Sequence, residues 1–203
     1  MGMFDANWFR HRIGSDRILP PTGGAGRLRE RPAKPLPGRV PLLLACATQT
    51  GVAEELARRT LRQLKAAGVA VRLANFDAVR LEMLQASERA LFIASTSFDG
   101  DPPDMADEFC QRQMASPASL HGLRYGLLAL GDANYREFCG FGMHLQRWLQ
   151  MSGARPLFDP VMVDDEDPAA LQLWRRQVNA CIRAPAGRLA VHRNACRGGK
   201  GDR

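Results

Sequence analysis

A buried strand, a hydroxyl-rich turn and the start of a helix are encoded in one run, Leu42-Leu43-Leu44-Ala45-Cys46-Ala47-Thr48-Gln49-Thr50-Gly51-Val52-Ala53-Glu54-Glu55-Leu56. Apolar residues that stop at small and hydroxylated ones, followed by leucines at helical spacing, are typical of the strand-turn-helix unit of an α/β domain. A helix start leaves backbone N–H groups unpaired and carries the positive end of the helix dipole, so the turn attracts an anion. Thr48, Gln49 and Thr50 add neutral donors, and Gly51 lets the backbone approach a ligand.

The residues absent from this turn narrow the choice of anion. It lacks the Gly-x-x-x-x-Gly-Lys-Ser/Thr pattern of a nucleoside triphosphate site and the Gly-x-Gly-x-x-Gly pattern of a dinucleotide site. Six residues after Cys46 stands Val52, where a cysteine-based phosphatase loop needs arginine. Two interpretations stay open, a cradle that holds a terminal phosphate without cleaving it and an N-capping turn with no ligand.

Charge is distributed unevenly along the 203 residues. Residues 1–40 and residues 181–203 each sum to +5, whereas residues 41–180 sum to −3, within a total of +7. A nucleic-acid-binding domain would carry its basic patch on the folded surface, so this distribution argues against one. We expect a flexible basic Pro/Gly-rich arm over 1–39, one domain over 40–182 and a flexible basic tail over 183–203.

The cysteines and the N-terminal sequence bear on the compartment. Five cysteines without a C-x-x-C pair favour free thiols in a reducing environment. The N-terminus lacks the pattern of a signal peptide, and no apolar run approaches the roughly 20 residues that a membrane span needs. We therefore expect a cytoplasmic chain without a membrane span, and we assign no metal ligands.

Alternating patterns of apolar residues continue through the domain. Strands are predicted at 40–46, 70–75, 90–95 and 124–130 and within 155–163, with helices near 52–67, 79–87 and 103–114, up to about 151, and over 168–181. Such alternation predicts a parallel sheet covered on both faces, in which sites form at the carboxyl ends of the strands. The loops after strands one, three and four hold most of the Gly, Thr, Ser, Asp and aromatic residues, so we expect one ligand to lie across them.

Three motifs at these strand ends carry a family resemblance: Thr48-Gln49-Thr50-Gly51, Ser95-Thr96 with Asp99-Gly100-Asp101-Pro102-Pro103, and Leu130-Gly131-Asp132 with Tyr135, Phe138 and Cys139. Together they resemble the flavodoxin domain of diflavin reductases. The likeness is greatest to the flavoprotein subunit of NADPH-dependent sulfite reductase, and cytochrome P450 reductase is more distant. The resemblance covers about 40–182. It implies an α/β, flavodoxin-like three-layer sandwich that binds FMN, with a five-stranded parallel sheet of order 2-1-3-4-5.

The resemblance also implies where the FMN would lie. Loop 48–53 would hold the ribityl phosphate, loop 96–100 one side of the isoalloxazine ring, and loop 131–135 the other side, with Tyr135 stacking on it. An acidic segment, 164–167, resembles the one ahead of the family's last helix. No catalytic residue is assigned, because the flavin carries the redox chemistry. The residues predicted to bind FMN are Thr48, Gln49, Thr50, Gly51, Val52, Ala53, Thr96, Ser97, Phe98, Asp99, Gly100, Leu130, Gly131, Asp132, Asn134, Tyr135, Phe138 and Cys139.

One position in the middle loop departs from the family pattern. Phe98 stands where the family's Gly-Glu-Gly-Glu/Asp-Pro motif has its first glycine. A Cβ at that position penalises left-handed backbone conformations. We therefore predict either weaker stabilisation of the one-electron-reduced flavin or a Phe98 ring that itself covers the flavin.

A second departure concerns the function. A diflavin reductase continues into a domain that binds FAD and NADPH, whereas only residues 182–203 follow Cys181 here. We predict an electron carrier that accepts electrons from a separate NADPH/FAD reductase and passes them singly to a redox acceptor such as a haem or iron–sulfur protein. Two alternatives stay open, a flavin-free binding module on a degenerate flavodoxin fold and a quinone or azo reductase on the same fold.

Overall fold

The computed structural model describes residues 40–183, so the predicted arm (1–39) and the predicted tail beyond residue 183 lie outside the described residues. No helix in this described part is long and apolar enough to cross a membrane. The strands are β1 (Leu42–Ala47), β2 (Val71–Asn75), β3 (Arg89–Ser95), β4 (Arg124–Gly131), β5 (Arg155–Pro156) and β6 (Val161–Asp164). The helices are α2 (Val52–Ala66), α3 (Leu81–Gln85), α4 (Asp104–Gln113), α5 (Gly140–Met151) and α6 (Pro168–Arg183), with a 3-10 turn η1 (Phe76–Ala78).

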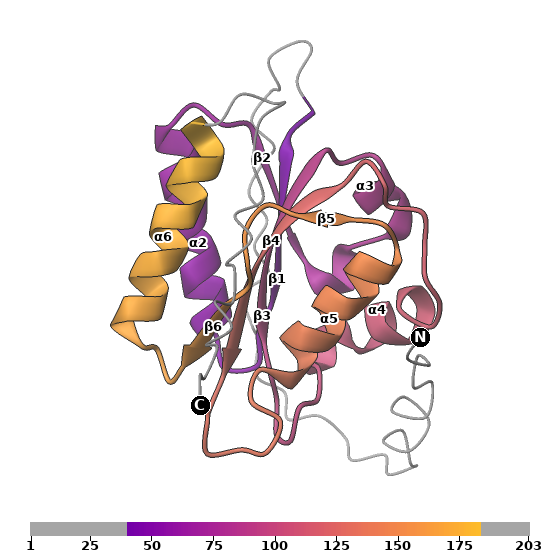
Figure 1. Cartoon of the computed structure of the whole chain (residues 1–203), viewed down its shortest axis with the longest axis vertical. Helices are drawn as coiled ribbons and strands as arrows, with labels where there is room; N and C mark the ends of the chain where they lie inside the picture. The colour runs from indigo at the N-terminus through magenta and orange to yellow at the C-terminus, as the bar shows by residue number, and fades with distance from the viewer. Residues whose placement is uncertain (1–39, 184–203) are drawn as a thin grey trace, which may run out of the picture.

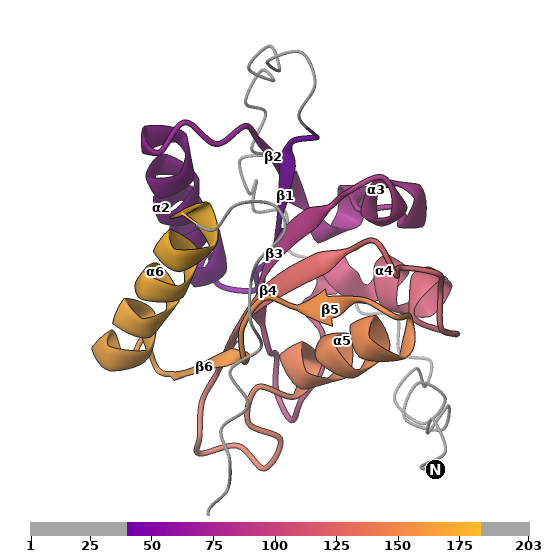
Figure 2. The same cartoon turned by 45° about the horizontal axis from the view of Figure 1, so that its top comes forward.

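All strands pair in parallel in one sheet of order β2-β1-β3-β4-β5, with β6 also paired to β4. Helices α2 and α6 cover one face, and α3, α4 and α5 cover the other (Figures 1 and 2). The predicted three-layer architecture and strand order are thereby confirmed. The continuous apolar run of β1 is buried along its whole length, as a central parallel strand requires.

Two apolar cores lie on the two faces of the sheet. On the α3–α5 side, Phe76 meets Phe109 and Phe141 edge to face, with ring centroids 5.2 and 5.8 Å apart. On the α2–α6 side, Trp174 packs among apolar residues, and its Nε1 donates a hydrogen bond to the Thr60 hydroxyl at 3.0 Å. This buried bond joins α6 to the middle of α2 and so ties together the two helices on this face of the sheet.

The predicted fifth strand is interrupted, and this corrects the expectation of a single strand within 155–163. Within this stretch only β5 and β6 pair with β4, and the chain leaves the ladder after Leu157, whose N–H still donates to the Tyr125 carbonyl. Proline at 156 and at 160 removes N–H donors from this stretch. Between the two, the Phe158 ring packs edge to face on Trp174, with centroids 5.7 Å apart. The sheet therefore has six strand segments rather than five.

Candidate functional site

The carboxyl ends of the strands surround a cleft of about 400 Å³. Its walls come from the loops that follow β1, β3, β4 and β6, which gather at the lower end of the sheet in the view of Figure 1. The residues lining it are Gln49, Thr50, Val52, Leu56, Ser95, Thr96, Ser97, Phe98, Leu130, Gly131, Asp132, Tyr135, Glu137, Cys139, Val163, Asp165 and Glu166. Residues from all three loops singled out in the sequence therefore meet in one cavity.

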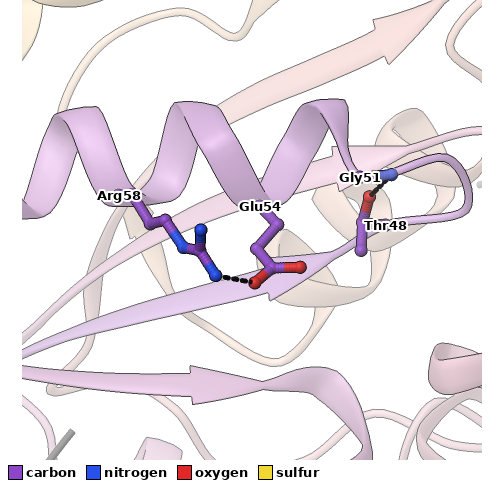
Figure 3. Close-up of polar contacts among 4 residues, drawn as sticks. All are labelled: Thr48, Gly51, Glu54 and Arg58. Atoms are coloured by element: carbon purple, nitrogen blue, oxygen red, sulfur yellow. Dashed lines mark hydrogen bonds and ion pairs between the residues drawn. The ribbon is translucent and has the colours of Figure 1, made fainter. Parts of the chain in front are cut away.

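The turn between β1 and α2 is closed by a side-chain hydrogen bond. The backbone N–H of Gly51 donates to the Thr48 hydroxyl at 2.8 Å (Figure 3). Gly51 has φ +96°, in the left-handed region, and a Cβ there would meet no atom within 4 Å. Gly51 is the N-cap residue of α2 and no side chain among residues 40–183 caps the helix, so the Thr48 bond closes the turn and does not cap α2. The next N–H groups, of Val52 and Ala53, have no acceptor among the described residues, and Val52 lines the cleft whereas Ala53 is buried beneath it.

Two glutamates in the first turn of α2 would repel an anion if they were unpaired. Glu54 accepts a hydrogen bond from Arg58 at 2.6 Å (Figure 3), and Glu55 accepts one from Arg59 at 2.9 Å. The arginines around Glu55, Arg59 first, hold the pKa of its carboxyl below the ordinary value. In both pairs the two residues are four positions apart on the helix. The arginines therefore offset the negative charge of Glu54 and Glu55 in the first turn of α2.

The loop after β3 is a tight reversal pinned at its base. Ser97 and Asp101 exchange two backbone hydrogen bonds of 2.8 Å, which closes the loop on the three residues between them. The Ser97 hydroxyl donates to the Gln49 side-chain oxygen at 3.3 Å and so ties this loop to the turn after β1. Phe98 adopts φ +45° with its ring 77% exposed beside the cleft. Phe98 therefore adopts the left-handed conformation that its Cβ penalises.

Thr96 carries an unsatisfied polar atom beside the cleft. Its backbone N–H donates to the Leu130 carbonyl at 2.9 Å, which fixes its position between β3 and β4. Its Oγ1 is buried and has no hydrogen-bond partner within the described chain, although Thr96 lines the cleft. A buried hydroxyl without a partner costs roughly 1–3 kcal/mol. A polar atom of a bound ligand would remove that cost.

The loop after β4 is held by Asp132 and Asp164. The Asp132 carboxylate accepts from the backbone N–H and the side-chain amide of Asn134, each at 2.8 Å, and Asp164 accepts from the Ala133 N–H at 2.8 Å. Tyr135 projects from this loop with half of its surface exposed. Its ring is therefore free to contact a planar ligand in the cleft that it lines.

Cys139 closes this loop as a buried thiol. The residue has φ +56° at the start of α5, and its Sγ donates to the Ala129 carbonyl at 3.3 Å. Burial raises the pKa of the Cys139 thiol to about 11, so it is protonated at neutral pH. A Cβ on Gly131 would lie 2.7 Å from the Cys139 backbone nitrogen, so glycine is needed where β4 meets the loop.

The two loops are packed against each other through glycine. A Cβ on Gly140 would lie 2.6 Å from the Gly100 Cα, and a Cβ on Gly100 would lie 2.9 Å from the Cβ of Glu137. The backbone of the loop after β3 therefore rests directly on the first turn of α5. This contact fixes the spacing of the two walls that carry Phe98 and Tyr135.

Acidic residues dominate the rim. Arg136 is the one cation in segments 96–104, 131–139 and 164–167, against nine carboxylates. Burial, with Asp104 and Asp101 nearby, raises the pKa of the Asp107 carboxyl. Any negative charge added to a ligand in the cleft is disfavoured by such a rim.

The cleft and the predicted site overlap without coinciding. Eleven predicted residues line it, from Gln49 to Cys139, whereas Thr48, Gly51, Ala53, Asp99, Gly100, Asn134 and Phe138 support its walls or lie beside it. Six lining residues were absent from the predicted set, namely Leu56, Ser95, Glu137, Val163, Asp165 and Glu166. The acidic segment at 164–167 was the available signal for the last two. Ser95 belongs to the quoted Ser95-Thr96 motif and Glu137 lies within the loop after β4, whereas Leu56 and Val163 are apolar residues that packing places there.

Known proteins resemble the chain in sequence. The family model for flavodoxin matches residues 44–176. The sulfite reductase [NADPH] flavoprotein alpha-component of Vibrio cholerae is 32% identical over 145 residues, which is 70% of this chain and 23% of the relative. The Klebsiella pneumoniae protein of the same name is 30% identical over 170 residues, 83% of this chain and 28% of the relative. The chain thus spans about a quarter of the length of these curated relatives.

Solved structures agree on the fold. A Streptococcus pneumoniae flavodoxin superposes with a TM-score of 0.60 at 26% identity, covering 70% of this chain and 99% of that one. A Pseudomonas aeruginosa flavodoxin variant gives a TM-score of 0.59 at 24% identity, over 71% of this chain and all of that one, and this likeness concerns the fold alone. The predicted relationship to the sulfite reductase flavoprotein is confirmed, and with it FMN as the cofactor that the family implies. The chain belongs to the flavodoxin family.

Proposed function

We propose that the chain is an electron carrier that holds FMN in the cleft at the carboxyl edge of the sheet. The observation that carries the proposal is the Thr96 hydroxyl, buried and unpartnered beside a cavity that is also lined by Val52, whose N–H has no acceptor among the described residues. A ligand with a phosphate at one end and a polar planar ring at the other would use both features. FMN has that build, and when bound it supplies one-electron chemistry.

The residues of the chain would each do a defined part of the binding. The N–H groups of Val52 and Ala53, with the Thr50 side chain, would hold the phosphate at the positive end of the α2 dipole. The Thr96 hydroxyl would hydrogen-bond to the ring system. Tyr135 and Phe98, both exposed beside the cleft, would cover the ring and exclude water from it.

Electrostatics would set the direction of electron flow. Asp132, Asp165 and Glu166 line the cleft, so they disfavour added negative charge there and lower the reduction potential of a bound group. An acidic rim also orients a partner with a basic docking surface. We propose a separate NADPH/FAD-dependent reductase as donor and a haem or iron–sulfur protein as acceptor. The cytoplasm remains the predicted compartment.

Electron transfer can be tested with purified components. The FMN-loaded chain is mixed with NADPH, a ferredoxin–NADP⁺ reductase and cytochrome c, with each component omitted in turn. We expect cytochrome c reduction to rise with the concentration of the chain only when the reductase is present. Sustained NADPH oxidation by the chain and a quinone, without the reductase, would instead identify a self-sufficient quinone reductase and overturn the proposal.

A further inference from the structure

Three arginines stand side by side at the end of the sheet opposite the cleft. Arg89 opens β3, Arg124 opens β4 and Arg155 opens β5, and the pairing register joins Arg89 to Arg124 and Arg124 to Arg155. Neighbouring parallel strands lie about 4.8 Å apart, so the three Cα atoms form a short straight row. We call Arg89, Arg124 and Arg155 the arginine row.

All three side chains emerge on the face covered by α2 and α6. On β3, Leu91 and Ile93 pack into the core on that face, and Arg89 has the same alternation. Leu128 and Leu130 place Arg124 there in the same way, and Leu157 does so for Arg155. Burial is the main influence on the pKa of the Cys181 thiol and raises it to about 11, while the Arg89 charge opposes that rise. Arg89 therefore lies near the last turn of α6.

The arginine row has no carboxylate partner within the described chain. Arg58, Arg59, Arg62 and Arg112 form ion pairs with glutamates, and all four lie on α2 or α4. Glu88 precedes Arg89 and is exposed, but it forms no ion pair with the row. Like charges on directly opposite strand positions destabilise a sheet. An anionic surface placed against the row would offset this repulsion.

More basic sequence joins the molecule at the same end. Strand β1 begins and α6 ends at the upper end of the sheet in Figure 1, away from the loops of the cleft. Residues 1–39 therefore connect there, with eight Lys/Arg against three Asp/Glu, and so do residues 184–203, with five against one. Within the described residues the cleft end is acidic, whereas the arginine row lies at the opposite end of the sheet.

Apolar side chains accompany the basic ones. Val40, the first described residue, is 47% exposed, and Met151 at the end of α5 is 42% exposed. Apolar residues mixed with arginine are typical of surfaces that bind at a lipid–water interface. Nucleic-acid phosphates would use the charges but not these side chains.

We propose that the end of the sheet bearing the arginine row docks on an anionic phospholipid surface. Arginine forks bind phosphate oxygens, and a flat bilayer needs no concave counterpart on the protein. The eight residues of β4 place the cleft roughly 25 Å from the row. Docking would therefore leave the cleft facing away from the lipid and open to redox partners. The inference stands whether or not the cleft binds FMN.

Vesicle co-sedimentation of the full chain tests the proposal. Vesicles rich in phosphatidylglycerol are compared with vesicles of phosphatidylcholine alone, at low and at physiological salt. We expect binding to the anionic vesicles only, weakening as salt rises. Retention on duplex DNA without any binding to the anionic vesicles would assign the basic end to nucleic acid and overturn the lipid proposal.

Matched double variants test the arginine row itself. Each arginine near an anionic leaflet strengthens binding about fivefold, so Arg124→Gln/Arg155→Gln should bind about 30-fold more weakly. Arg136→Gln/Arg175→Gln removes the same charge from exposed positions at the cleft end and on the outer side of α6, and should bind nearly as the unmodified chain does. If both double variants lost vesicle binding equally, net charge alone would account for the binding, and the role of the arginine row would be overturned. If the first double variant fails to fold, Arg155→Gln alone, at an exposed site, should lose about fivefold.

Discussion

The backbone N–H of Gly51 donates to the Thr48 hydroxyl at 2.8 Å, so the turn that we assign to the FMN phosphate is held in shape before any ligand arrives. Thr48 does not line the cleft. Its contribution is to fix the backbone of the turn, in which the N–H groups of Val52 and Ala53 have no acceptor among the described residues. The phosphate site is thus organised by a side chain that need not touch the ligand.

Replacement of Thr48 should test this support directly. In Thr48→Val the Gly51 N–H loses its acceptor, and we expect the free energy of unfolding of the FMN-free chain to fall by about 1 kcal/mol. Thr48→Ser keeps the hydroxyl and should retain most of the stability. Urea denaturation monitored by circular dichroism measures both variants. Equal stability of the Val and Ser variants would show that the bond contributes nothing.

The backbone of Gly51 supplies a second test of the turn. With φ +96°, an L-residue is strained there, although a Cβ would meet no atom within 4 Å. We expect Gly51→Ala to lose about 1–2 kcal/mol of stability from backbone strain alone. Gly122 offers the control, because it also has open space around its Cβ position but lacks the positive φ. Gly122→Ala should be nearly neutral, and a similar loss in both variants would contradict the strain argument.

Phe98 combines backbone strain with an exposed ring. At φ +45° the residue is in the left-handed region, and its ring is 77% exposed. Phe98→Gly should therefore be about 1 kcal/mol more stable than Phe98→Ala in the FMN-free chain, because only glycine is unstrained there. If the ring covers the flavin, both variants should bind FMN roughly fivefold more weakly. Titration by quenching of FMN fluorescence measures this, and unchanged affinity in both variants would contradict the covering role.

The cysteines of the described chain should resist modification. Burial raises the pKa of Cys46 to about 12 and the pKa values of Cys139 and Cys181 to about 11, and it also raises the pKa of Cys110. Each thiol therefore stays protonated until the pH rises well above the ordinary thiol pKa. In a Cys196→Ser variant, which keeps only these four, we expect negligible reaction with Ellman's reagent at pH 8 in buffer and complete reaction in urea. Rapid reaction of the folded variant would contradict their burial.

Local sequence patterns were sufficient for most of the fold. The apolar runs and the helix start at Val52 predicted the order of elements, and most boundaries fall within one or two residues of the observed ones. The interruption between β5 and β6 was missed because it depends on Phe158 turning onto Trp174, a contact between distant segments. Gly126 in β4 leaves room for that ring, since a Cβ there would lie 2.5 Å from the Phe158 Cζ.

The sequence predicted the polar and aromatic residues of the candidate site that follow the strand ends. It did not predict the residues that reach the cleft only through tertiary packing. Threonine, glycine and tyrosine in three loops identified the cleft from sequence. Val163 and Leu56 reach it only because β6 and α2 pack beside β4 and β1, and apolar residues carry no functional signal. Asp165 and Glu166 enter through a turn in which both have positive φ, a geometry that their residue types do not specify.

The visible absorption spectrum of the full chain, recorded after FMN is added and the excess removed by gel filtration, tests the central claim most directly. The account predicts flavin bands at one FMN per chain, because the N–H of Val52 and the Thr96 hydroxyl have no hydrogen-bond partner among the described residues and FMN could supply one for each. A colourless chain that retains no added FMN would contradict it and would leave a flavodoxin fold that serves as a binding module.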